Sequence, residues 1–260
     1  MVSMQDAGIM EIVSNPEAYA RYLRMQGDNP MYSAGNIALA MVQEPHATAI
    51  ATQDRWKDLG RYVLDTERNE GIQIFTRAPL GKGYVITNAY DISQTGGRDV
   101  KRQALANDTP AMEKALAALL NYAVVPVVID SELTVPAYYD YRKIELAIQP
   151  GFPDTEAFAA IAAEIAQCRF HAKGVNRTYN REESELDAES VSCILCKRFG
   201  IQRDLPNLEN LTTLYEGWEP QEARQALTNI QEMSKQIGNS IERDISPKQH
   251  SRASMHRSAR

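Results

Sequence analysis

The spacing of apolar residues changes once within the first hundred positions. Near the start they recur every three to four positions, which predicts helices over residues 16–27, 33–44 and 53–59. Residues 72–76 and 84–90 instead alternate between apolar and polar types, and a Gly-Lys-Gly turn lies between them. This alternation predicts a β-hairpin, so the first part of the chain is expected to be a mixed α/β unit.

Longer helical patterns dominate the rest of the chain. They predict helices over residues 110–120, 154–172 and 182–199, and a last helix that begins after Pro220. Between the first two, the apolar run 124–129 suits a buried strand or a connector, and residues 143–148 alternate as a half-buried strand should.

These elements predict an α+β fold. We expect a mixed α/β N-terminal domain over residues 1–98, a connector helix and strand over 99–135, a mainly helical domain over 136–245, and a disordered basic tail over 246–260.

Composition narrows the classes of function. The chain has 43% hydrophobic and 24% charged residues, its net charge is −6, and no apolar run is long enough to span a membrane. Any nucleic-acid site must therefore be a local patch. Three cysteines, an odd number, and the lack of a signal-peptide pattern favour a cytoplasmic protein with free thiols.

One segment has the frame of a zinc-peptidase helix. In AAIAAEIAQCRFH (159–171), Glu164 occupies the glutamate position of a His-Glu-x-x-His motif, but Ala163 and Gln167 replace both histidines. The next predicted helix is acidic, and its Glu185 and Glu189 lie one turn apart. Alanine has no donor atom and a glutamine amide is a poor zinc ligand, so we expect no catalytic residue and no bound metal.

Several motifs together resemble a known family. The acidic helix is similar to that of the metallopeptidase-like domain in ArdC-type antirestriction proteins of plasmids, conjugative elements and phages. The first half carries five ordered motifs similar to the N-terminal domain of the same family: MYSAGN (31–36), QEPHAT (43–48), WKDLGR (56–61), GIQI (71–74) and YDISQTGG (90–97). The resemblance implies that the second domain is a zincin-like metallopeptidase domain. Because Ala163 and Gln167 depart from the family's histidines, we expect this domain to be degenerate and the protein not to be an enzyme.

The resemblance also implies that the N-terminal domain binds single-stranded DNA. Aromatic rings can stack on bases, cations can neutralise phosphates, and polar side chains can add further contacts. The candidates are Tyr32, Trp56, Lys57 and Arg61, with Asn36, Gln43, Gln94 and Thr95 as polar contacts. Each has a structural alternative, since the aromatics can pack in a core and the amides can satisfy buried backbone groups.

Other interpretations stay open at this stage. Cys168 and His171, with Cys193 and Cys196, form a CxxH…CxxC set that is either a structural metal site or a group of core residues. The leading hypothesis is a DNA-binding, antirestriction-like accessory protein of a mobile element, without a cofactor. The alternatives are a pseudo-enzyme adaptor that binds a host protein and a metallopeptidase with atypical ligands, namely Glu164, Glu185, Glu189 and His171.

Overall fold

The computed structural model describes residues 1–78, 81–174 and 179–246. The N-terminal part begins with three helices, α1 (Val2–Ser14), α2 (Pro16–Asp28) and α3 (Ala34–Gln43). Five strands and a short helix follow: β1 (Ile50–Thr52), α4 (Gln53–Asp58), β2 (Arg61–Val63), β3 (Ile72–Arg77), β4 (Tyr84–Asp91) and β5 (Thr95–Gly97). Two 3₁₀ turns, Asp65–Glu67 and Ile92–Gln94, complete this part.

The C-terminal part is mainly helical. It contains α5 (Pro110–Leu120), β6 (Val127–Ile129), β7 (Ala137–Asp140), β8 (Glu145–Ile148), α6 (Asp154–Gly174), α7 (Arg181–Arg198), α8 (Leu211–Leu214) and α9 (Pro220–Ile245). The α+β organisation predicted from the sequence is confirmed. The predicted tail lies outside the described residues from position 247 onward.

Local sequence signals explain most helix ends. The Asn15 side chain caps α2 by accepting from the N–H groups of Glu17 and Ala18, and Ser33 caps α3 in the same way. Thr109 caps α5, where proline occupies the first turn. The long helix α9 opens with a capping box of Glu219 and Glu222.

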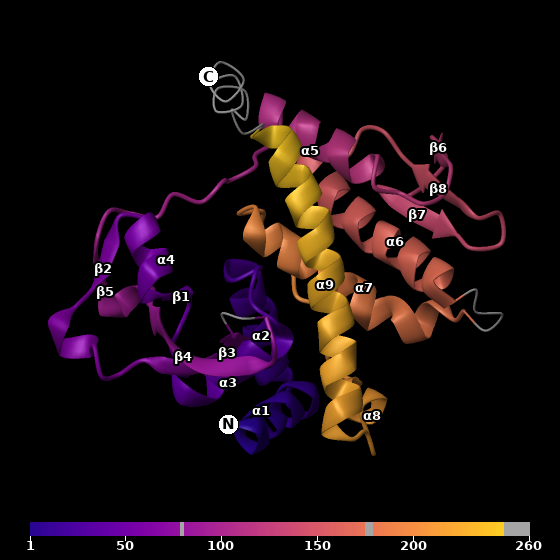
Figure 1. The fold of residues 1–260 in the computed structure, drawn as a ribbon. Helices are drawn as coiled ribbons and strands as arrows, with labels where there is room; N and C mark the ends of the chain where they lie inside the picture. Colours follow the sequence, from indigo (N-terminus) through magenta and orange to yellow (C-terminus); the bar gives the residue numbers. More distant parts are fainter. Residues whose placement is uncertain (79–80, 175–178, 247–260) are drawn as a thin grey trace, which may run out of the picture.

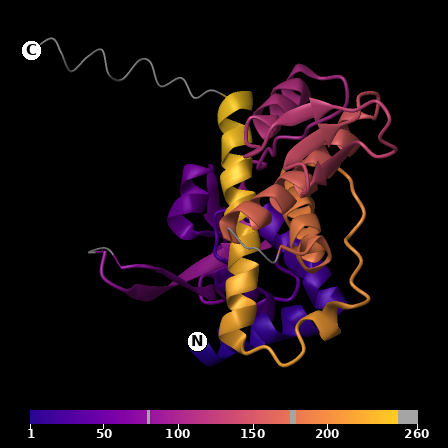
Figure 2. The ribbon, with the colours of Figure 1, turned by 90° about the vertical axis from the view of Figure 1, so that its right-hand side faces the viewer.

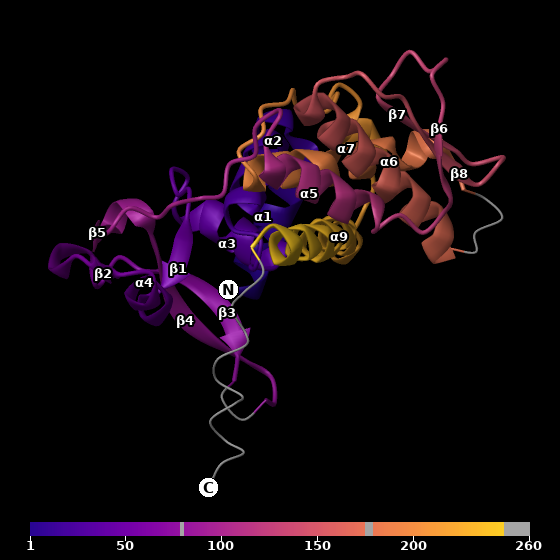
Figure 3. The same cartoon turned by 90° about the horizontal axis from the view of Figure 1, so that it is seen from above.

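Three small sheets hold the strands. One has the order β1-β4-β3 and is antiparallel, a second pairs β2 with β5, and the third has the order β6-β8-β7. Figure 3 shows the first two sheets at one end of the molecule and the third at the other. The second half of the apolar run 124–129 forms β6, but this strand lies at a sheet edge and Ile129 is 69% exposed. The prediction that the run is buried was therefore wrong.

One hydrophobic core runs through both predicted domains. It takes buried residues from α1, α2 and α3 as well as from α5, α6, α7 and α9. Figure 1 shows α9 crossing the molecule beside α1, α5 and α7. At Gly27 of α2, an added Cβ would lie 2.6 Å from Cβ of Lys197 on α7, so only glycine allows this close approach. None of the helices in the described residues is long and apolar enough to cross a membrane.

Candidate nucleic-acid interface

Two amide side chains of the N-terminal motifs close one edge of a sheet. Asn36 donates to the carbonyl oxygen of Phe75 at 2.8 Å and accepts from the N–H of Phe75 at 3.0 Å. Gln43, two turns later on α3, makes the same pair of bonds with Gln73 at 2.9 Å each. Both amides thus satisfy the outer backbone groups of β3, as a neighbouring strand would. The sequence had predicted both as DNA contacts.

Trp56 is a core residue in this structure. Its side chain is 2% exposed, packs in a small cluster with Val63 and Tyr90, and donates from Nε1 to the carbonyl oxygen of Tyr90 at 2.8 Å. Its ring therefore offers no free face to a base. Tyr32 is half-buried against the main core, and burial raises the pKa of its hydroxyl.

Gln94 and Thr95 also have structural roles. Gln94 completes a capping box with Asp91, accepting from the Asp91 N–H at 2.9 Å, and Thr95 is buried. Arg61 donates to the Thr95 hydroxyl and to the carbonyl oxygens of Thr95 and Arg98. These bonds tie β2 to β5 and to the segment that follows it.

The predicted cations Lys57 and Arg61 nevertheless line one groove. It has a volume of about 290 Å³ and lies between α4, β2 and the turn at 65–68. Two residues that sequence reasoning missed complete it. Tyr62 is 62% exposed, and Arg68 forms an exposed ion pair with Asp65 at 2.7 Å. We call the surface formed by Lys57, Arg61, Tyr62 and Arg68 the basic groove.

The basic groove combines the residue types that bind single strands. Its three cations outnumber the one carboxylate of the lining, that of Asp65. The exposed ring of Tyr62 can stack on a base. This ring lies over Gly96, where an added Cβ would be 2.9 Å from the Tyr62 hydroxyl. The small residues of the YDISQTGG motif therefore position Tyr62.

A second, larger cavity suits an anion less well than the basic groove does. It has a volume of about 620 Å³ and lies between α6, α7 and residues 202–204. Its charged lining consists of Glu156, Glu189, Asp204 and Arg203, and Arg203 pairs with Glu189. This lining has a negative net charge, so it disfavours phosphate.

Within the segment that has the frame of a His-Glu-x-x-His motif, an arginine binds the glutamate. Glu164 on α6 is 8% exposed, and both its oxygens accept from Arg181 of α7, at 2.9 and 2.5 Å. The N–H of Tyr139 on β7 donates to the same carboxylate at 2.8 Å. Gln167 is bound by the Tyr179 hydroxyl at 2.8 Å. An internal guanidinium thus neutralises the glutamate that would act as general base.

The residues around this pair do not fit a catalytic metal. Ala163 has no donor, Glu185 is exposed, and Glu189 is held by Arg203. The Nδ1 atom of His171 lies 2.6 Å from the Tyr139 hydroxyl. Its ring stacks on Tyr179 at 4.4 Å. Within the part of the chain that the structure describes, no group of three or more His, Cys, Asp or Glu side chains could hold a metal ion. The four proposed atypical ligands are therefore not gathered.

The CxxH…CxxC set is likewise not gathered into a group that could hold a metal ion, within the described ranges of the chain. Cys168, Cys193 and Cys196 are free and buried. Burial raises the pKa of their thiols to about 12, 11 and 12, respectively. All three thiols pack among the residues of the main core.

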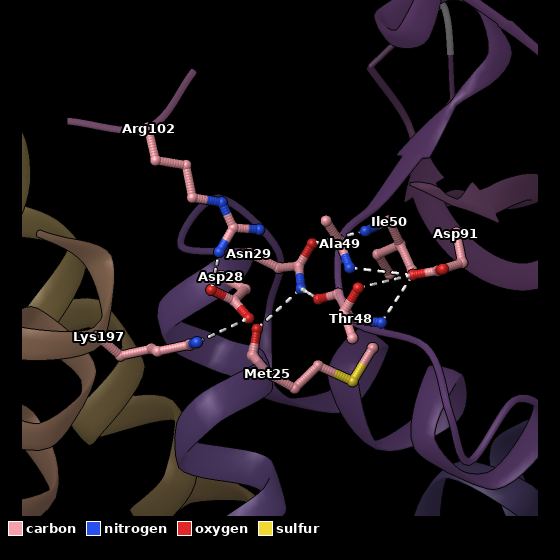
Figure 4. A network of polar contacts seen from close by, with 9 residues as sticks. All are labelled: Met25, Asp28, Asn29, Thr48, Ala49, Ile50, Asp91, Arg102 and Lys197. Atoms are coloured by element: carbon pink, nitrogen blue, oxygen red, sulfur yellow. Dashed lines mark hydrogen bonds and ion pairs between the residues drawn. The ribbon is translucent and has the colours of Figure 1, made fainter. Parts of the chain in front are cut away.

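A polar network joins the N-terminal and C-terminal parts of the chain (Figure 4). Asn29, at the end of α2, donates to the carbonyl oxygens of Met25 and Thr48 and accepts from the Ile50 N–H at 2.8 Å. Asp28 pairs with Arg102 and with Lys197 of α7. The network fixes the start of β1 to α2, and through α2 to the helical part.

Comparison with known proteins identifies the fold. No family model and no curated protein matches the sequence. The metal-free crystal structure of the antirestriction protein ArdC from plasmid R388 matches with a TM-score of 0.56 and 15% identity, covering 94% of this chain and 98% of ArdC. The Mn(II)-bound structure of ArdC matches with a TM-score of 0.56 and 16% identity, covering 95% and 99%. The chain therefore has the fold of the ArdC antirestriction protein, in agreement with the resemblance of its motifs.

Proposed function

We propose that this protein binds single-stranded DNA and acts in the cytoplasm as an antirestriction-like accessory factor of a mobile element. The basic groove carries this proposal. It gathers three cations and an exposed tyrosine on a chain whose net charge is −6, and such a local patch is what a single strand needs. The likeness to an antirestriction protein over nearly the whole chain supports the same function.

Removing two cations of the basic groove tests the proposal. We expect the double variant Lys57→Gln/Arg68→Gln to bind a fluorescent oligo(dT) roughly tenfold more weakly at low salt. Each lost phosphate contact should also reduce the slope of log K against log salt by about 0.7. Fluorescence anisotropy at several salt concentrations measures both quantities.

Arg55→Gln is the matched control. Arg55 is exposed on the same helix, α4, but does not line the basic groove, so this substitution removes a charge without removing a contact. If the control lowers log K by half as much as the double variant, which removes two charges, only net charge matters. A folded wild-type sample that binds no oligonucleotide at low salt would refute the proposal.

We further propose that the metallopeptidase-like helices are catalytically inactive. The Glu164–Arg181 pair supports this, because a metal cation would have to displace a guanidinium that already binds both carboxylate oxygens. Protein purified without chelator should carry less than about a tenth of an equivalent of transition metal, since a zinc site needs three or four protein ligands. Elemental analysis measures this, and a stoichiometric metal would overturn the proposal.

A further inference from the structure

The β3–β4 hairpin extends beyond the body of the protein (Figure 2). Six consecutive residue pairs, from Ile72 with Ala89 to Arg77 with Tyr84, hold its strands together. The third strand of the sheet, β1, pairs only with the last three residues of β4. Among the described residues, residues 84–88 of β4 therefore have a neighbouring strand on one side only.

The two faces of the hairpin differ in burial. Successive side chains of a strand point to opposite faces, and directly paired residues share a face. One face is anchored in the main core by Ile72, Ile74 and Ala89. The opposite face consists of Gln73, Phe75, Arg77, Tyr84, Ile86 and Asn88, which we call the hairpin face. Phe75 is half-buried and the other five residues are exposed.

The chemistry of the hairpin face is unusual for this chain. Arg77 and Tyr84 are directly opposite each other, so an exposed cation lies beside a ring that is 70% exposed. A second exposed cation, Lys82, lies in the turn. No acidic residue occurs between positions 72 and 90, although the whole chain has 34 acidic residues. The hairpin is therefore a positive, aromatic surface on an acidic protein.

We propose that the hairpin face is a second contact surface for single-stranded DNA, separate from the basic groove. A base stacks on Tyr84, while Arg77 and Lys82 contact the phosphates on either side. The amides of Gln73 and Asn88 can bond to base edges. From Gln73 to Arg77 the face is about 13 Å long at 3.3 Å per residue. This is the length of about four stacked nucleotides at 3.4 Å each.

A protein strand is the competing occupant, because no strand in the described part of the chain pairs with residues 84–88 along the outer edge of β4. The other edge of the hairpin is closed by Asn36 and Gln43. Pairing of strands would use this backbone edge and would not require a cation beside an aromatic ring on one face. The side chains of the hairpin face therefore favour a nucleic acid.

The test compares variants on the two faces of the hairpin. Tyr84→Leu keeps an apolar side chain but removes the ring, and Arg77→Gln removes the charge. Val85→Thr is the matched control, because Val85 is 42% exposed, adjacent to Tyr84, and on the opposite face. Circular dichroism and thermal melting establish that all three fold. Anisotropy with a labelled oligo(dT) of about 20 nucleotides then measures affinity at several salt concentrations.

We expect Tyr84→Leu to weaken binding about tenfold, as the loss of one stacked base does. Arg77→Gln should weaken binding and reduce the salt slope by about 0.7. Val85→Thr should bind like the wild type.

This inference rests on the proposed function, and the two fail in different ways. If the wild type binds DNA and both variants bind equally well, the hairpin face is not a contact and the basic groove still is. If the wild type binds no DNA, the proposed function fails and this inference fails with it. If the variants change only the mass measured by analytical ultracentrifugation, the hairpin mediates self-association, which also overturns the inference.

Discussion

Replacing Trp56 with alanine should lower the free energy of unfolding by about 3–5 kcal/mol. The side chain is 2% exposed and is the largest member of the small core cluster beneath β1, β2 and β4. Removing it leaves a cavity and deprives the Tyr90 carbonyl oxygen of its donor. Urea denaturation followed by circular dichroism measures the loss. Weaker DNA binding by this variant would then reflect the unfolding of the scaffold of the basic groove.

Trp56→Phe separates packing from a direct contact with DNA. Phenylalanine keeps most of the ring volume but cannot donate to the Tyr90 carbonyl oxygen, so we expect a cost of about 1–2 kcal/mol and a folded protein. This variant should bind DNA as the wild type does. A Trp56→Ala protein of unchanged stability that loses DNA affinity would instead show that the indole ring leaves the core to stack on a base.

Replacing Arg181 with methionine should lower the free energy of unfolding by about 2–4 kcal/mol. The change leaves the carboxylate of Glu164 buried, with the N–H of Tyr139 as its one remaining donor among the described contacts. The expected loss is below that of a fully buried pair because the side chain of Arg181 is 28% exposed. Thermal and urea denaturation measure it.

Two further variants test whether the uncompensated charge of Glu164 causes this loss of stability. Glu164→Leu/Arg181→Met should recover much of the lost stability, since an apolar pair removes the uncompensated charge. Arg243→Met makes the same substitution in an exposed ion pair with Asp244 and should change stability by no more than about 0.5 kcal/mol. If Arg181→Met proves as stable as the wild type, the guanidinium does not stabilise the degenerate site.

The sequence predicted the elements that depend on local signals. The helices capped by Asn15, Ser33 and Thr109 begin where expected, and the β3–β4 hairpin formed across its Gly-Lys-Gly turn. The three-residue strands β1, β2 and β5 were missed because they depend on distant partners. Arg61 of β2, for example, pairs with Gly97 of β5. Helix α1 was missed as well, since no capping side chain marks its start.

The candidate site was harder to predict than the fold. A sequence shows that Asn36 and Gln43 are polar but not whether they satisfy a ligand or the backbone, and here they bond to β3. Arg181 gave no signal, because its contact with Glu164 depends on how α6 and α7 pack. Tyr62 and Arg68 were likewise brought to Lys57 by folding alone. The structure thus gives structural contacts to several motif residues, and their contact with DNA stays a prediction.

The shared core has a consequence for the evolution of this architecture. Helix α2 belongs by sequence to the N-terminal motifs, yet it packs against α7, and Gly27 fits against Lys197 without room for a methyl group. Selection can retain α6 and α7 independently of any chemistry they carry, because without them α2 would expose its apolar side to water. These two helices thereby act as structural support for the N-terminal part of the chain.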